Sequence, residues 1–290
     1  MADIKIHHRD TCRLCLSDNV ELVIPFKPAA IAEKYVKEIP LTTETLVPVD
    51  LYMCISCGHV QILDVIDPQY LWGEYTYHSG QTQGIIDHFS DVSHHIMTKY
   101  GKVDNRFIID VGSNDGTLLR FFFEKNYQVL GIDPATEIAA KATASGIETI
   151  PSLLTEKLAN KVVAQYGKAD LITAFNVFAH ADEMVDLGRS IQHMLAKDGV
   201  FIFEVSYLLD IVNKMLVGTI FHEHLCNHSL APMKTFLALV GLEIFDVERV
   251  SIQGGSIIGY AQQVDGPKTI QPSVDELLAL EEKEGLHTVE

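Results

Sequence analysis

Short apolar runs alternate with amphipathic stretches between residues 106 and 205. The apolar runs have the length and composition of buried strands, and apolar residues recur at helical spacing between them. The pattern predicts strands at residues 107–111, 128–132, 148–151, 171–175 and 200–205, and helices at residues 116–125, 137–145, 154–165 and 182–195. Strands separated by single helices need crossover connections. The sequence therefore predicts an α/β fold, with a parallel sheet covered by helices on both faces.

Weaker patterns flank this region. They predict a helix at residues 85–100 and a strand at residues 46–53 before it, and a helix at 229–240, strands at 242–250 and 256–262 and a helix at 274–284 after it. We divide the chain into a first domain of residues 1–69, an aromatic connecting segment of residues 70–100, a main domain of residues 101–265 and a tail of residues 266–290.

The composition limits the classes of protein to which the chain can belong. Of its 290 residues, 47% are hydrophobic and 21% charged, as in ordinary globular proteins. No run approaches the ~20 apolar residues of a membrane helix, and the charged N-terminus lacks the apolar core of a secretory signal. A formal charge of −17 disfavours nucleic-acid binding, which needs Lys and Arg to displace counterions. We therefore expect a cytoplasmic protein without a membrane or nucleic-acid partner.

Four of the five cysteines form two Cys-x-x-Cys pairs, Cys12 with Cys15 and Cys54 with Cys57. In a chain without an export signal, such pairs favour a metal over disulfides. Four thiolates complete a tetrahedral zinc site and leave no open position for catalysis. We therefore predict a structural zinc in the first domain, with His59 as a weaker substitute ligand. The alternative is a set of buried free thiols.

A glycine-containing turn follows the first predicted strand of the main domain. It contains Asp110, Gly112, Asn114 and Gly116, and Asp133 follows the next strand. Gly112 allows the backbone to approach a ligand closely, while Asp133 suits the two hydroxyls of a ribose. The turn lacks the second glycine that makes room for a pyrophosphate, and a carboxylate at Asp110 suits an ammonium group. The pattern favours S-adenosylmethionine (SAM) over a nicotinamide dinucleotide or a turn without a ligand.

Two imidazoles and a carboxylate stand together at His222, Glu223 and His224. This is not the His-Glu-x-x-His pattern, whose histidines share one face of a zinc-binding helix. Residues two apart face the same side in an extended strand or loop. Histidine titrates near neutrality and can remove a proton from a carbon beside a ketone, with Glu223 to orient it. The alternative is that these are surface or structural histidines.

Several motifs occur along nearly the whole chain in the order of a known enzyme family. They are Cys12-x-x-Cys15, Cys54-x-x-Cys57-Gly58, Glu74-Tyr75-Thr76-Tyr77-His78-Ser79, the turn of residues 110–116, Asn176-Val177-Phe178-Ala179-His180, Glu204-Val205, His222-Glu223-His224 and Gly254-Gly255-Ser256. On these motifs the chain resembles the zinc-containing, SAM-dependent sugar C-methyltransferases that act on nucleotide-linked 4-keto-deoxysugars.

The resemblance implies a Rossmann-like SAM methyltransferase domain with a small N-terminal zinc-binding domain. It also implies C-methylation, in which a base removes the proton beside the ketone and the enolate carbon takes the methyl group. The site residues that it implies are His224 as the base, His180, Tyr75 and His222 to steer or stabilise the enolate, Glu223 in support, and Asn176 among the cofactor-binding residues.

The chain departs from the family pattern at three positions and at its end. It has Phe221 where the family has tyrosine, Gln253 where the family has histidine, and Ile258 where the family has arginine. Family members usually continue into a C-terminal α/β unit, of which residues 266–290 would be only the start. Two alternatives therefore stay open: an O- or N-methyltransferase for another small molecule, and a non-catalytic SAM-binding subunit that works with a partner chain.

Overall fold

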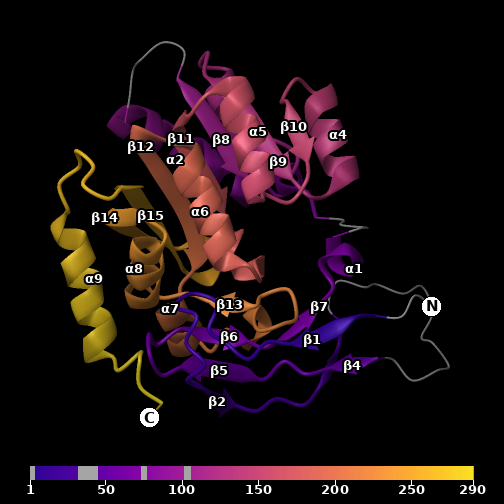
Figure 1. The fold of residues 1–290 in the computed structure, drawn as a ribbon, viewed down its shortest axis with the longest axis vertical. Helices are drawn as coiled ribbons and strands as arrows, with labels where there is room; N and C mark the ends of the chain where they lie inside the picture. The colour runs from indigo at the N-terminus through magenta and orange to yellow at the C-terminus, as the bar shows by residue number, and fades with distance from the viewer. Residues whose placement is uncertain (1–3, 32–44, 73–76, 101–105, 290) are drawn as a thin grey trace.

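Seven strands form the central sheet in this computed structural model, which describes residues 4–31, 45–72, 77–100 and 106–289. Their order is β10-β9-β8-β11-β12-β15-β14 (Figure 1). The parallel strands are β10 (Thr149–Pro151), β9 (Gln128–Asp133), β8 (Phe107–Val111), β11 (Ala169–Phe175) and β12 (Leu195–Ser206). The strand β15 (Ser256–Gln263) is antiparallel to β12, and β14 (Leu242–Val250) is antiparallel to β15. The predicted α/β sheet is confirmed.

Helices cover both faces of this sheet because its strands bury side chains on alternate sides. In β8, Phe107 and Ile109 belong to one apolar cluster, whereas Ile108 belongs to another. The first cluster includes side chains of α5 (Glu156–Tyr166), α6 (Met184–Met194) and α8 (Leu230–Leu239), and the second those of α2 (Gln83–Tyr100) and α3 (Thr117–Phe123). The helix α4 (Thr136–Ala144) packs on β9 and β10. None of the helices in the described ranges is long and apolar enough to cross a membrane.

A smaller sheet with the order β13-β6-β5-β2 lies below the central sheet in Figure 1. Its antiparallel strands β2 (Val20–Ile24), β5 (Leu51–Cys54) and β6 (Val60–Ile62) come from the first domain. Its fourth strand, β13 (Cys226–Asn227), comes from the main domain and pairs with β6. The pairs β1 (Ile6–His8) with β7 (Asp64–Ile66) and β3 (Ala29–Ala30) with β4 (Leu46–Val47), together with α1 (Pro68–Trp72), complete this region.

The prediction of one strand over residues 46–53 is wrong. The structure divides this segment into β4 and β5, which belong to different sheets. Pro48 lies at the break, where it has no N–H group to donate to a neighbouring strand. The side chain of Asp50 accepts a hydrogen bond from the backbone of Phe26 at 2.7 Å, which fixes the chain between the two strands.

Each predicted helix of the main domain lies within two residues of an observed one, but β12 begins at Leu195 rather than at residue 200. The sequence did not predict the short elements that connect the strands. These are α7 (Leu208–Asn213), η1 (Ser79–Gln81), η2 (Phe178–His180), η3 (Val217–Thr219) and η4 (Ile252–Gly254). Each is shorter than the two or three helical turns over which a periodic pattern can be recognised.

The predicted tail helix is present as α9 (Pro272–Lys283), which packs on β14 and α8. Glu281 of this helix is fully buried, and its carboxylate accepts hydrogen bonds from the N–H groups of Leu230 at 2.6 Å and Ala231 at 3.0 Å. These N–H groups belong to the first turn of α8 and have no partner within that helix. A negative carboxylate at this N-terminal end also interacts favourably with the positive end of the helix dipole. Glu281 therefore anchors the tail to the main domain.

We expect Glu281→Ala to lower the free energy of unfolding by about 1–3 kcal/mol, because it leaves the buried N–H of Leu230 and the part-buried N–H of Ala231 without an acceptor. Chemical denaturation of the variant and the wild type measures the difference. Glu282→Ala, which removes an exposed carboxylate from the same helix, is the matched control. Equal effects of the two substitutions would contradict the anchoring role.

Candidate functional site

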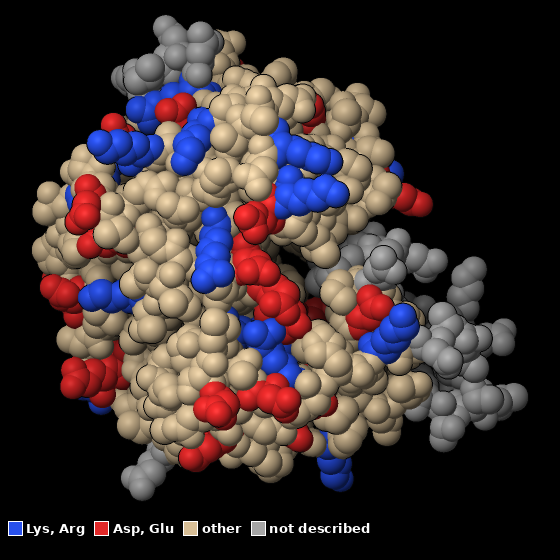
Figure 2. Space-filling model, in the orientation of Figure 1, with Lys and Arg blue, Asp and Glu red and all other residues tan. Residues whose placement is uncertain are grey.

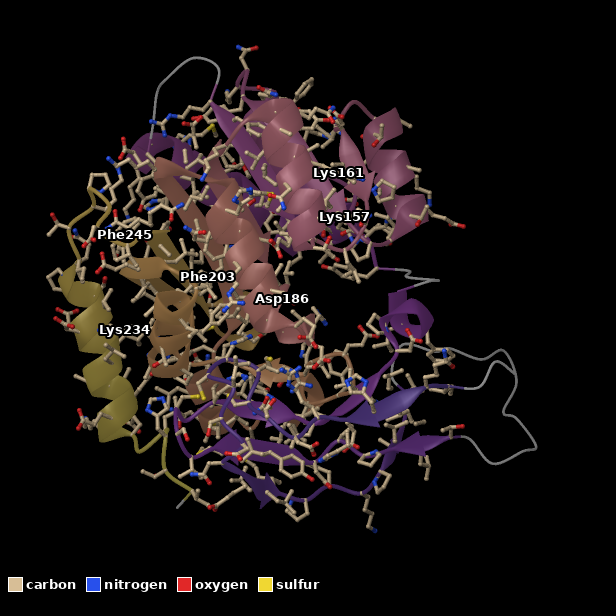
Figure 3. The ribbon with its side chains drawn as sticks, in the orientation of Figure 1. Lys157, Lys161, Asp186, Phe203, Lys234 and Phe245 are labelled. Atoms are coloured by element: carbon tan, nitrogen blue, oxygen red, sulfur yellow. The ribbon has the colours of Figure 1, made fainter. Side chains whose placement is uncertain are left out.

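A cavity of about 1060 Å³ lies at the carboxyl ends of the parallel strands. Its lining includes Val111 at the end of β8, Asp133 at the end of β9 and Asn176 just after β11. The strand order reverses between β8 and β11, and open α/β sheets bind ligands beside such a reversal. Asp186 of α6 also belongs to the lining and lies beside the opening in Figure 3.

The two glycines of the predicted cofactor turn have a left-handed backbone that other residues rarely adopt. The φ angles are +70° at Gly112 and +78° at Gly116. The N–H of Gly112 donates to the carbonyl of Ile132 at 2.7 Å, which holds the turn against β9. A Cβ atom at Gly112 would collide with the side chain of Val177. Gly112 lines the cavity, whereas Gly116 precedes α3 and lies outside the lining.

Asp133 lines the cavity and fixes the conformation of the turn. One carboxylate oxygen accepts the N–H of Asn114 and the other accepts the N–H of Ala135, both at 2.8 Å. Burial raises the pKa of Asp133, and these two hydrogen bonds act in the opposite direction. Each oxygen keeps a further lone pair. A contact of these oxygens with the two hydroxyls of the ribose of SAM stays a prediction.

The Asn114 side chain connects the turn to the segment before α2. Its oxygen accepts the N–H of Ser79 at 3.0 Å, and its amide nitrogen donates to the carbonyl of Tyr77 at 3.0 Å. Both partners line the cavity, so part of the aromatic segment forms its wall. Tyr75, predicted to be a site residue in this segment, lies outside the described residues.

Asp110 and Asn176 differ in their access to the cavity. Asp110 is 4% exposed, lies outside the lining and accepts a hydrogen bond from the Thr173 hydroxyl at 2.6 Å. Burial raises the pKa of Asp110 to about 7. Asn176 belongs to the lining and has a φ of +57°. Its amide donates at 3.1 Å to the carboxylate of buried Glu204, which also contacts His88 at 2.5 Å. The Asn176 amide is therefore fixed by Glu204 of β12, whereas the Asp110 carboxylate is fixed by Thr173 of β11.

His224 and Glu223 line the cavity, but His222 does not. The N–H of His224 donates to the carbonyl of Phe221 at 2.9 Å, so this segment forms a tight turn rather than a strand. The Nε2 atom of buried His222 instead lies 3.1 Å from the carbonyl oxygen of Val47 in the first domain. The turn also packs the ring of Phe221 on the imidazole of His224, with 4.2 Å between the ring centroids.

His180, at the end of η2, meets His224 in the cavity with 5.0 Å between the ring centroids. The Nδ1 atom of His180 lies 2.9 Å from the carbonyl oxygen of Glu223, and Nδ1 of His224 lies 2.7 Å from that of Thr219. A carbonyl oxygen only accepts, so both Nδ1 atoms donate and both Nε2 atoms carry the lone pair. Burial lowers the pKa of His180 to about 3 and also lowers the pKa of His224. Both imidazoles are therefore neutral at pH 7.

The four predicted zinc ligands come together in the first domain. The sulfur atoms of Cys12, Cys15, Cys54 and Cys57 all lie within 4.8 Å of one another. The Cys12–Cys57 and Cys15–Cys54 distances are 3.7 Å and 3.5 Å, close to the ~3.8 Å that a tetrahedral zinc with bonds of about 2.3 Å requires. His59 is buried but does not belong to this group. The four thiols fit a structural zinc.

Acidic side chains gather at the mouth of the hollow in Figure 2. The acidic residues of the cavity lining are Asp133, Glu156, Asp182, Glu183, Asp186 and Glu223. Their negative charge favours the positively charged sulfonium of SAM over an anionic cofactor.

Two residues of the lining, Asp182 and Gln253, were not predicted as site residues. The position of Asp182 depends on residues that are distant in the sequence. The two glycines after Gln253 indicate a turn, and its φ of +50° places this polar residue in the lining.

Comparison with known proteins agrees with this geometry. Residues 12–72 match a family described as "Putative zinc binding domain", and residues 91–246 match one described as "Methyltransferase domain". The C-methyltransferase NovU of Streptomyces niveus is 31% identical over 278 residues, which are 96% of this chain and 66% of NovU. The chain thus spans slightly less than two thirds of the length of this relative.

A solved structure shares the fold of the main domain. Magnesium protoporphyrin IX methyltransferase (ChlM) from Synechocystis PCC 6803, with bound S-adenosylhomocysteine, is 16% identical. It aligns with a TM-score of 0.50 over 67% of this chain and 92% of its own. The likeness shows the fold of the main domain.

We expect Asp133→Asn to weaken SAM binding about 10- to 100-fold, because hydrogen bonds to a charged group contribute about 1.5–3 kcal/mol. The amide group would also place a donor against one of two backbone N–H groups. Isothermal titration calorimetry measures the change. Asp198→Asn, at an exposed position of β12, is the control. Unchanged affinity in Asp133→Asn would exclude a ribose contact by this residue.

Proposed function

Because the chain belongs to the SAM-dependent methyltransferases with an N-terminal zinc-binding domain, we propose that it is a C-methyltransferase for a nucleotide-linked 4-keto-deoxysugar. The methyl group is added to the carbon beside the ketone, through an enolate. The observation that carries the proposal is the neutral imidazole of His224 in the same cavity as the cofactor turn.

His224 is the base in this proposal. Its Nδ1 proton is held by the Thr219 carbonyl, so the lone pair of Nε2 is the basic group. Removal of the proton from the sugar carbon makes His224 an imidazolium and the substrate an enolate. Packing against Phe221 keeps water from one face of the imidazole, which favours the neutral form before reaction.

His180 has a narrower role than the resemblance implies. An enolate oxygen needs hydrogen-bond donors, whereas neutral His180 uses its one N–H on the Glu223 carbonyl. We therefore assign to His180 the acceptance of a hydrogen bond from a sugar hydroxyl. The donors for the enolate oxygen are the Gln253 amide and the Tyr77 hydroxyl, both in residues of the lining, together with Tyr75 as the resemblance implies.

In this proposal, Glu223 and His222 hold other parts of the site in position. The Glu223 carbonyl orients His180, and its side chain belongs to the lining beside the base. His222 contacts the first domain rather than the cavity, so we assign it to anchoring this turn. Gly112, Asn114 and Asp133 would hold SAM, whose sulfonium would give its methyl group to the enolate carbon and leave as S-adenosylhomocysteine. Asn176 forms the wall between the cofactor turn and the histidines.

We test the base by omitting SAM and following the exchange of the proton beside the ketone in deuterated water. His224→Ala should slow this exchange about 10²- to 10⁴-fold, the usual contribution of a general base. His94→Ala, which removes an exposed imidazole of α2, should leave the rate unchanged. Wild-type exchange in His224→Ala would assign the base elsewhere.

Complete reactions distinguish the proposal from its alternatives. With SAM, the product should carry the new methyl group on carbon, whereas an ether or an N-methyl product would support the second chemistry. The nucleotide-linked sugar and the same sugar without the nucleotide are compared, because the nucleotide rests on the resemblance. SAM binding without turnover on any keto-sugar would support a non-catalytic subunit.

The pH dependence follows from the neutral base. His224 reacts only when unprotonated, and burial lowers its pKa below the ordinary histidine value of about 6.5. As pH falls, kcat/KM should therefore be retained through pH 6.5 and decline only below it. The pH profile of kcat/KM with the keto-sugar measures the midpoint. A midpoint above 6.5 would contradict a buried neutral base.

A further inference from the structure

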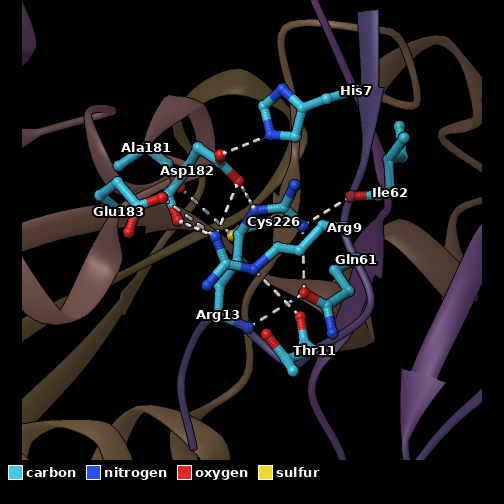
Figure 4. Close-up of polar contacts among 10 residues, drawn as sticks. All are labelled: His7, Arg9, Thr11, Arg13, Gln61, Ile62, Ala181, Asp182, Glu183 and Cys226. Atoms are coloured by element: carbon cyan, nitrogen blue, oxygen red, sulfur yellow. Dashed lines mark hydrogen bonds and ion pairs between the residues drawn. The ribbon is translucent and has the colours of Figure 1, made fainter. Parts of the chain in front are cut away.

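A buried arginine lies inside the first zinc knuckle. Arg13, between Cys12 and Cys15, is 0% exposed, and its guanidinium contacts three groups (Figure 4). It donates to the carbonyl of Ile62 at 2.6 Å, to the side-chain oxygen of Gln61 at 3.0 Å and to the carboxylate of Asp182 at 2.9 Å. A permanently charged group at this depth needs such partners because it has lost its water. Only the last of these partners belongs to the main domain.

Asp182 contacts several residues of the first domain. Besides Arg13, its carboxylate accepts Arg9 at 3.2 Å and lies 3.3 Å from Nε2 of His7, and its carbonyl also accepts Arg9 at 3.2 Å. The carboxylate is 13% exposed, whereas the imidazole of His7 is 60% exposed and can contribute little. Asp182 lines the cavity and follows His180 by two residues. The contact therefore acts on the chain immediately after a proposed substrate-binding group.

We infer that the Arg13–Asp182 ion pair is a positioning contact that sets His180 against the base His224. This inference rests on the proposed function. The zinc knuckle holds the backbone of Arg13, Arg13 holds Asp182, and Asp182 fixes the end of η2. A second connection runs from β6 through its pairing with β13 to the chain just after His224. The first domain thus holds both histidines, each by a separate contact, and determines their spacing.

Loss of the Arg13–Asp182 ion pair should affect catalysis more than it affects the binding of zinc or SAM. In the proposed function SAM binds at the glycine-containing turn, and the backbone N–H groups of Gly112 and Asn114 in this turn donate to β9 rather than to Asp182. Loss of the ion pair should therefore leave zinc content unchanged, and Arg13→Met, which keeps the Asp182 carboxylate in the lining, should keep SAM affinity within about twofold of wild type. A misplacement of about 1 Å at a group that positions the substrate can lower a rate about 100-fold. Arg13→Met and Asp182→Asn should accordingly slow proton exchange about 10- to 100-fold.

The test compares these variants with a conservative variant, a double variant and a control. Arg13→Lys keeps the positive charge but carries its hydrogen-bond donors on a single nitrogen atom. Its exchange rate should therefore lie between those of wild type and Arg13→Met. The double variant Arg13→Met/Asp182→Asn should be no slower than the slower single variant, since each single substitution already removes the Arg13–Asp182 ion pair. Asp64→Asn removes the partner of His8 at 3.1 Å elsewhere in the first domain and should leave exchange unchanged.

A readout without substrate separates this inference from the proposed function. In protein labelled with 15N-histidine, the imidazole signals of His180, assigned by their loss in His180→Gln, should shift in Arg13→Met and Asp182→Asn but not in Asp64→Asn. Unshifted signals, or wild-type exchange in zinc-replete variants, would overturn the inference. If wild-type protein exchanges no keto-sugar proton, the proposed function fails and the imidazole signals alone decide. If Arg13→Met loses zinc, Asp182→Asn decides, because it leaves the knuckle unchanged.

Discussion

The pairing of β13 with β6 is the contact that holds the turn of residues 221–224 against the first domain. In it, the N–H of Ile62 donates at 2.9 Å to the carbonyl of Leu225, the residue directly after the proposed base His224. Two residues of pairing contribute little by themselves. However, β6 begins three residues after Cys57, and structural zinc contributes about 10–16 kcal/mol in zinc-finger peptides at pH 7. In the proposed function, the zinc site predicted for the first domain thus contributes to the placement of the His224 imidazole.

Burial shifts the pKa of Asp133 and the pKa values of the two histidines in the cavity in opposite directions. It raises the pKa of Asp133, where two backbone N–H groups oppose the effect and keep the carboxylate able to accept ribose hydroxyls. It lowers the pKa of His180 and His224, where the neutral form is the one that accepts protons. Burial of these side chains in one cavity therefore suits both the proposed ribose contact of Asp133 and the proposed base His224, because Asp133 accepts backbone N–H groups and His224 does not.

The sequence predicted the elements and motifs that depend on neighbours along the chain. The period of apolar residues identified every long helix, and the spacing of the cysteines identified the sulfur cluster. It did not predict β13, because two residues carry no period. Residues two apart were expected to face one side, yet the turn at Phe221 sends His222 and His224 to different partners. The Arg13–Asp182 pair has no signal in either local segment, since 168 positions lie between them.

The three departures from the family pattern divide according to where the fold places them. Phe221 and Gln253 both line the cavity, the first against the base and the second on a strained turn. Ile258 lies on β15 opposite Glu204, is 2% exposed and packs in the cluster beneath α2. An apolar ring beside His224 removes a hydroxyl from one wall, and an amide at Gln253 returns a donor to another. The differences at positions 221 and 253 therefore affect which substrate the cavity binds and through which contacts. The apolar residue at position 258 instead packs in the core of the sheet that carries the site.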